Sequence, residues 1–229
     1  MLRVAVLRFP GSNSDVDAVR AAERAGADSY LVWHRDSDLR GADVVVIPGG
    51  FSYGDYLRAG AIARFSPVMQ AVQRHAADGG AVLGICNGFQ ILCEAHLLPG
   101  QLLRNAQLTF LARPVEVRIE RTDTPFTADY AEGERLRLPV AHGDGRYVAS
   151  EDVLRELEAE GRVVMRYVTE EGASPNGSAH DIAGICNAER NVVGLMPHPE
   201  RAFDPVLGNS DGLAFFTAPA SRHATTGRS

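Results

Sequence analysis

The sequence predicts an α/β fold, in which an open and mostly parallel sheet carries helices on both faces and is extended by antiparallel strands. Over about the first 95 residues, short apolar runs alternate with amphipathic segments, which is typical of strand–helix–strand units. From about residue 102 to 141, single apolar and polar residues alternate instead. That pattern is typical of antiparallel strands with one exposed face, and it indicates the extension.

The first half divides into strands and helices at glycine, proline and capping residues. Four β-branched apolar runs are predicted to be strands buried on both faces: 4–7, 30–33, 44–47 and 81–85. We expect a helix over 14–25, after the polar pair Ser12-Asn13, and a second over 67–77, which opens with Ser66-Pro67.

The second half is predicted to complete one domain. We expect half-exposed strands at 114–120 and 136–140, a helix at 153–160, a strand at 163–168, a hairpin of 182–187 with 192–196, and a final helix at 211–217. A chain of 229 residues fits one large core. We therefore expect a single domain over 1–217 and a flexible tail over 218–229.

The composition excludes several functions. All 23 basic residues are arginine, so the chain has neither a phosphate-loop lysine nor a lysine that could form a Schiff base. A net charge of −6 argues against a nucleic-acid surface. The three cysteines lack the spacing of a zinc site or a disulfide framework. The first residues indicate no secretory signal, and no apolar stretch is long enough for a membrane span, so we expect a cytoplasmic protein without a bound metal.

The sharpest chemical signal is Gly84-Ile85-Cys86-Asn87-Gly88, which follows a predicted buried strand and precedes a helical run. This pattern is the cysteine form of the nucleophile elbow, in which a strained turn presents the nucleophile at the carboxyl end of a strand. The following helix favours a thiolate, and the Asn87 amide can donate to an oxyanion. The alternative is a structural cysteine in a glycine-rich strand end. Cys93, further along the helix, is expected to be a core thiol.

A base and a second oxyanion donor are predicted elsewhere. Prolines on both sides of His198 are expected to keep the chain extended, so that His198 and Glu200 project to the same side. Glu200 can then orient the imidazole as the base for Cys86. The pair Gly49-Gly50 follows a strand and offers backbone amides. Taken singly, each is also compatible with a plain loop; together they indicate cysteine acyl transfer.

The order of these motifs resembles that of the class I (triad) glutamine amidotransferases over nearly the whole chain. More specific segments resemble the family of glutaminase subunits of phosphoribosylformylglycinamidine synthase, which acts in purine biosynthesis. These segments are Phe9-Pro10-Gly11-Ser12-Asn13, the stretch 49–60, His142-Gly143-Asp144-Gly145-Arg146, Pro175-Asn176-Gly177-Ser178 and Met196-Pro197-His198-Pro199-Glu200-Arg201.

The resemblance implies a flavodoxin-like fold and hydrolysis of glutamine through a γ-glutamyl thioester on Cys86. His198 would act as base and then acid, and Glu200 would orient it. The resemblance also implies four further site residues: Gly50 and Asn87 as oxyanion donors, and Phe51 and Gln90 as contacts of the glutamine.

The resemblance further implies partners. Ammonia would pass to a large synthetase subunit that uses ATP and Mg²⁺ to convert formylglycinamide ribonucleotide to formylglycinamidine ribonucleotide. A very small third subunit would bridge the two, and this chain would need no cofactor. The segment His142 to Arg146 is interpreted as a docking or gating element; the alternative is a plain turn.

Two positions depart from the family pattern. Ser14 stands where a cysteine is usual, which we expect to affect only packing. Pro114 stands where an aromatic residue is usual, and a proline cannot donate to a sheet ladder, so an altered sheet edge is expected there.

Two other functions are weighed against this one. A free-standing cysteine hydrolase, such as a γ-glutamyl hydrolase or a peptidase, would keep the same triad but act without partners. A non-catalytic subunit would keep the fold and lose a member of the triad. Cys86, His198 and Glu200 are all present, which argues against the second alternative.

Overall fold

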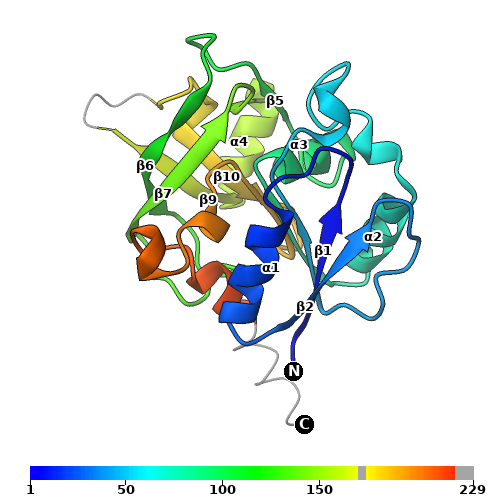
Figure 1. The fold of residues 1–229 in the computed structure, drawn as a ribbon. Coiled ribbons are helices and arrows are strands. Elements are labelled where there is room, and N and C mark those ends of the chain that lie inside the picture. Colours follow the sequence, from blue (N-terminus) through cyan, green and yellow to red (C-terminus); the bar gives the residue numbers. More distant parts are fainter. Residues whose placement is uncertain (170–173, 220–229) are drawn as a thin grey trace.

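The computed structural model describes residues 1–169 and 174–219. Within these ranges, nine strands form one sheet in the order β2-β1-β3-β4-β11-β10-β9-β6-β7 (Figure 1). The five parallel strands are β1 (Arg3–Arg8), β2 (Asp28–Trp33), β3 (Val44–Ile47), β4 (Ala81–Ile85) and β11 (Val192–Leu195). Their order is that of a flavodoxin-like sheet. The predicted fold class is confirmed.

Four antiparallel strands extend the sheet beyond β11. They are β10 (Ile182–Cys186), β9 (Val163–Val168), β6 (Leu111–Ile119) and β7 (Arg135–His142). Pro114 lies inside β6, opposite Pro139 of the edge strand β7. The pairing of β6 with β9 starts only at Glu116, so the missing donor of Pro114 interrupts no ladder on that side.

Two helical layers cover the parallel strands. α1 (Asp15–Arg24) lies on one face, where its Ala22 lines a small cavity together with Val4, Val46 and Leu83. α2 (Pro67–Ala77) and α3 (Asn87–Glu94) lie on the other face, where a side chain at Gly84 would meet Leu92 (Figure 1). This alternation along β4 is why the apolar runs are buried on both sides. No helix among the described residues is long and apolar enough to cross a membrane.

Several predicted boundaries need correction. β2 is an edge strand with a half-exposed face, so it is not buried on both faces as predicted. The N-cap of α1 is Ser14, whose side chain makes no capping bond, so Ser12-Asn13 does not cap the helix. α4 (Glu151–Ala159) begins two residues earlier than predicted. The last helical stretch is 214–219. Residues 218 and 219 of the predicted tail are thus helical, and the rest of the predicted tail, 220–229, lies outside the described residues.

Two short strands were not predicted. β5 (Gln101–Leu103) and β8 (Arg146–Val148) form a small antiparallel sheet beside α3. β8 continues directly from the segment His142 to Arg146, so that segment is a turn between two strands. The turn is therefore held at both ends.

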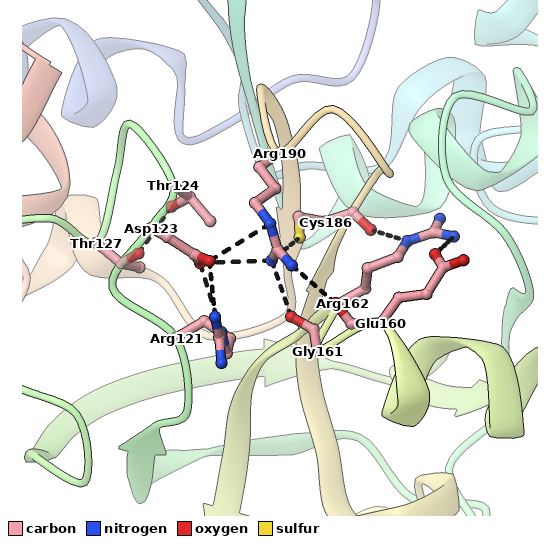
Figure 2. A network of polar contacts seen from close by, with 9 residues as sticks. All are labelled: Arg121, Asp123, Thr124, Thr127, Glu160, Gly161, Arg162, Cys186 and Arg190. Atoms are coloured by element: carbon pink, nitrogen blue, oxygen red, sulfur yellow. Dashed lines mark hydrogen bonds and ion pairs between the residues drawn. The ribbon is translucent and has the colours of Figure 1, made fainter.

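An arginine network fixes the end of the sheet where β11 begins (Figure 2). Arg190, in the turn before β11, pairs with Asp123 and donates to the carbonyl oxygens of Gly161 and Glu160 at 2.9 and 2.7 Å. Figure 2 also shows Arg162 donating to the carbonyl oxygen of Cys186, at 3.1 Å. Three loops are thereby tied together at the end of β11 opposite to its carboxyl end.

Gly88 sets the distance between α3 and β3. A Cβ built on Gly88 would overlap the carbonyl oxygen of Ile47 and lie 2.7 Å from its carbonyl carbon. We expect Gly88→Ala to lower the free energy of unfolding by about 2–3 kcal/mol, because α3 must move away from the sheet. The matched control is Gly133→Ala, which meets no neighbour and costs only the strain of a positive φ, about 1 kcal/mol. Urea unfolding measures both; equal costs would contradict the packing argument.

Candidate active site

Cys86 sits in a strained turn between β4 and α3. Its φ of 53° and ψ of −105° lie where a residue with a side chain is rarely found. The turn is possible because Gly84 and Gly88, on either side of it, have no side chains. A Cβ at Gly84 would lie 2.5 Å from Leu92 and 2.8 Å from the carbonyl of Gly88. The backbone N–H of Cys86 donates to Leu195 of β11 at 2.8 Å. This is the geometry of a nucleophile elbow.

His198 and Glu200 form a buried pair just after β11. Glu200 Oε1 lies 2.6 Å from His198 Nδ1, and both side chains are almost completely buried. The contact is made through a 3₁₀ turn, Pro199–Arg201, and not through the extended chain that the flanking prolines predicted. A turn suffices because it still brings residues two apart onto one side.

The electrostatics favour a protonated His198. Burial alone lowers the pKa of an imidazole, but the Glu200 carboxylate and Cys86 outweigh burial and raise the pKa of His198 to about 9. The second ring nitrogen, Nε2, is buried and has no hydrogen-bond partner among the described residues. It is therefore available to the neighbouring sulfur and to a bound substrate.

Gly49 and Gly50 lie beneath His198 and against the first loop. A Cβ at Gly49 would lie 2.7 Å from His198 Cε1, and one at Gly50 would lie 2.6 Å from the Gly11 carbonyl oxygen. The Gly49 carbonyl accepts from the N–H groups of Asn13 and Ser14, each at 3.2 Å. The segment that follows β1 therefore holds the glycine pair in place, and no larger residue fits at either position.

Asn87 and Gln90 brace the loops around the cysteine. The Asn87 side chain accepts from the Ser52 N–H at 3.1 Å and donates to Gln90 Oε1 at 2.8 Å. Gln90 Nε2 donates to the carbonyl oxygen of Asp144 at 2.6 Å. Both amides are buried, so they fix the loop after β3 and the turn after β7 relative to α3.

Four of the predicted residues line one cleft, whereas Asn87, His198 and Glu200 are not among its lining residues. It is lined by Gly50, Phe51, Asp55, Cys86, Gln90, Ala141, His142, Gly143 and Asp144. Phe51 stands half-exposed at this cleft and stacks on Phe110, with ring centroids 6.4 Å apart. Cys86 Sγ lies 3.8 Å from the Ala141 carbonyl oxygen. The structure thus brings the predicted residues Gly50, Phe51, Cys86 and Gln90 to one cleft.

Two titratable groups of this cleft were not predicted to act there. Burial, with the nearby charge of Asp144, raises the pKa of Asp55 to about 6. Burial, with the charge of His198, lowers the pKa of His142 to about 4. Both residues lie in segments that the family resemblance singled out, 49–60 and His142 to Arg146. Their roles, however, depend on contacts between loops that are far apart in the sequence.

Ser14 also lies closer to the site than predicted. Its hydroxyl is fully buried and accepts from Arg201 Nη2 at 2.6 Å. Arg201 belongs to the turn that carries Glu200, so Ser14 links α1 to that turn. Cys93 is buried on α3, where burial raises the pKa of its thiol, as a core position implies. Among the described residues, no three or more His, Cys, Asp or Glu side chains gather to hold a metal ion.

The arrangement can carry out acyl transfer. A strained cysteine, a histidine with a buried carboxylate partner, and backbone amides at a helix start meet at the carboxyl edge of a parallel sheet, where open α/β folds bind ligands. This fold and this site define the class of glutamine amidotransferases with a cysteine, histidine and glutamate triad. The chain belongs to the CobB/CobQ-like glutamine amidotransferase domain family, which it matches over residues 1–212.

Curated relatives narrow the class. The chain is 62% identical to the phosphoribosylformylglycinamidine synthase subunit PurQ of Rubrobacter xylanophilus, over 93% of this chain and 94% of the relative. It is 59% identical to the PurQ subunit of Thermus thermophilus, over 94% and 96%. Among solved structures, a chain of PurLQS from Thermotoga maritima is 42% identical, with a TM-score of 0.88 over 97% of this chain and 99% of that one.

More distant structures share the fold. The glutaminase domain of a CTPS from Trypanosoma brucei superposes with a TM-score of 0.62 at 15% identity, over 96% of this chain and 94% of that one.

The His198–Glu200 pair predicts a pH-dependent stability. The folded-state pKa of His198, about 9, lies above its ordinary value of 6.5. Its ion pair therefore stabilises the fold fully below about pH 6.5, and this contribution is lost as the pH rises through about 9. We expect Glu200→Gln to be less stable than the original chain by on the order of 3 kcal/mol at pH 6, and the gap to shrink by pH 10. Urea unfolding at both pH values measures the gap.

A gap that stays constant between pH 6 and 10 would contradict this assignment. Glu158→Gln is a matched control, because Glu158 also contacts a histidine, His180, and pairs with Arg166, but its own side chain is exposed. We expect its cost to be below about 1 kcal/mol at either pH.

Proposed function

We propose that the chain is the glutaminase subunit of phosphoribosylformylglycinamidine synthase and hydrolyses glutamine to glutamate and ammonia. The observation that carries this proposal is a strained Cys86 that neighbours His198, whose other nitrogen is held by a buried carboxylate. Relatives with the name of this synthase subunit match more than nine-tenths of the chain, which supports the choice of enzyme.

The triad acts in two half-reactions. The proton of the Cys86 thiol resides on His198, as the raised pKa of His198 favours, and the Cys86 thiolate attacks the side-chain amide carbon of glutamine. The backbone N–H groups of Gly50 and Asn87 donate to the oxyanion, and the imidazolium of His198 returns a proton to the departing ammonia. A water then gives its proton to His198, attacks the thioester and releases glutamate. Glu200 keeps the imidazole oriented and stabilises its charge in both halves.

The substrate is positioned by the cleft walls. Phe51 covers the cleft beside the cysteine, and Gln90 lines it. Gln90 uses both ends of its amide within the protein, so its effect on glutamine is to set the place of Asp144 and Asn87. Residues 1–217 act as one domain, because a single sheet connects the first strand with the last.

The ammonia is used by partner subunits. The similar Thermotoga maritima chain occurs in a structure of PurLQS, which supports assembly of this chain with a synthetase subunit and a small bridging subunit. The synthetase subunit would use ATP and Mg²⁺ to make formylglycinamidine ribonucleotide. This chain would contribute only its own side chains and need no cofactor, and its three free cysteines fit a reducing cytoplasm.

The free-standing hydrolase is the weaker candidate. A γ-glutamyl hydrolase or peptidase would use the same triad, but the similar chains reported above are synthase subunits along nearly their full length. The test is glutamine hydrolysis by the chain alone and with both partner subunits, their nucleotides and Mg²⁺. A large rise on assembly supports the amidotransferase; fast hydrolysis without partners supports the hydrolase.

Cys86→Ala separates the two activities of the complex. We expect the variant to lose glutamine-dependent synthesis at least about 1000-fold, because the thioester cannot form. Synthesis from added ammonium chloride should remain within about twofold of the original, since the synthetase site lies in another subunit. Cys93→Ala is the matched control, and it should keep glutamine-dependent synthesis. Retained activity of Cys86→Ala would disprove the assignment of the nucleophile.

A further inference from the structure

Two carboxylates face the cleft that holds Cys86. Asp55 comes from the loop after β3, and Asp144 comes from the turn after β7. They are close enough for the charge of Asp144 to raise the pKa of Asp55. Neither forms an ion pair with any residue in the described parts of the chain, and no arginine lines the cleft. Two like charges are therefore kept together without a protein cation between them.

Both carboxylates are held in place by strained or braced backbone. Asp55 has a φ of 54°, and Tyr53, Gly54 and Leu57 beside it are also left-handed. Each such residue other than glycine costs on the order of 1 kcal/mol. Asp144 is tied through its carbonyl oxygen to Gln90 Nε2, at 2.6 Å. Relaxing these left-handed residues would stabilise the loop. The strain therefore indicates that the Asp55 side chain is held in a particular position.

A buried imidazole adds a third acceptor. His142 is 3% exposed, lines the same cleft, and its Nε2 has no partner among the described residues. Its Nδ1 lies 3.1 Å from Asn105 Oδ1, and the Asn105 amide nitrogen already donates to the carbonyl oxygens of Thr109 and His142. Nδ1 must therefore carry the hydrogen, which leaves a lone pair on Nε2. The lowered pKa of His142 keeps the ring neutral.

We propose that Asp55 and Asp144, together with Nε2 of His142, bind the α-ammonium group of glutamine. This inference rests on the proposed function and identifies which end of the substrate these residues recognise. An ammonium group carries three N–H donors and a positive charge, which match two carboxylates and a neutral acceptor. The side-chain amide, at the other end of the glutamine, then reaches Cys86 in the same cleft.

The test compares glutamine with glutaramate, the analogue in which hydrogen replaces the α-ammonium group. Each is assayed with the complex of this chain and its synthetase and bridging subunits. We expect Asp55→Asn and Asp144→Asn to raise the KM for glutamine about 10- to 100-fold, as loss of a charged hydrogen bond implies, with kcat little changed. Hydrolysis of glutaramate should be unaffected. His142→Leu should also raise the KM for glutamine, and His142→Gln, which keeps an acceptor, should raise it less.

Two controls separate binding from damage. Asp38→Asn removes the same charge at an exposed position that does not line the cleft, and it should leave the hydrolysis of both substrates unaffected. Alkylation of Cys86 by iodoacetamide, which has no ammonium group, should proceed at the original rate in every variant. An unchanged KM for glutamine, or an equal loss of glutaramate hydrolysis or alkylation, would overturn the proposal. If the unmodified complex hydrolyses no glutamine at all, the proposed function itself fails.

Discussion

The site depends on the close packing of the β4–α3 turn against β3 and β11. Cys86 can hold its strained backbone only because Gly84 and Gly88 place no side chain of their own between α3 and the sheet. The hydrogen bond from Cys86 to Leu195 then fixes the cysteine relative to β11, from which His198 follows within three residues. One tight contact between backbones thus sets the position of both the nucleophile and the base.

The sequence predicted the parts that local pattern determines. The strands 44–47, 81–85 and 163–168 were predicted with their observed bounds, because the first two are continuous apolar runs between turn residues and the third is apolar except for Arg166. The exposure of β2 could not be predicted, since it follows from its place at the sheet edge. β5 and β8 were missed because three residues are too few to show a period. The motifs were found, but the contacts of Asp55, Ser14 and His142 join loops that only the fold brings together.

Charge is distributed unevenly over the site. At the base, the buried Glu200 favours the charged form of His198, whereas His142, nearby and equally buried, faces a positive neighbour and stays neutral. Two imidazoles in one site therefore have opposite protonation preferences. The difference follows from Glu200 and Cys86, which raise the pKa of His198, because burial alone would lower the pKa of both rings.

Hydrogen bonds hold β11 and the residues before and after it in place. The N–H of its first residue, Val192, donates to Asn187 Oδ1 at 2.9 Å. Arg190 ties together the loops before it (Figure 2). The N–H of His198, just beyond it, donates to the Pro139 carbonyl oxygen at 2.8 Å. Because this four-residue strand is held in place, it fixes the spacing between Cys86 and His198. The sheet therefore fixes this spacing, whereas the residues that face Cys86 across the cleft belong to the loop after β3 and the turn after β7.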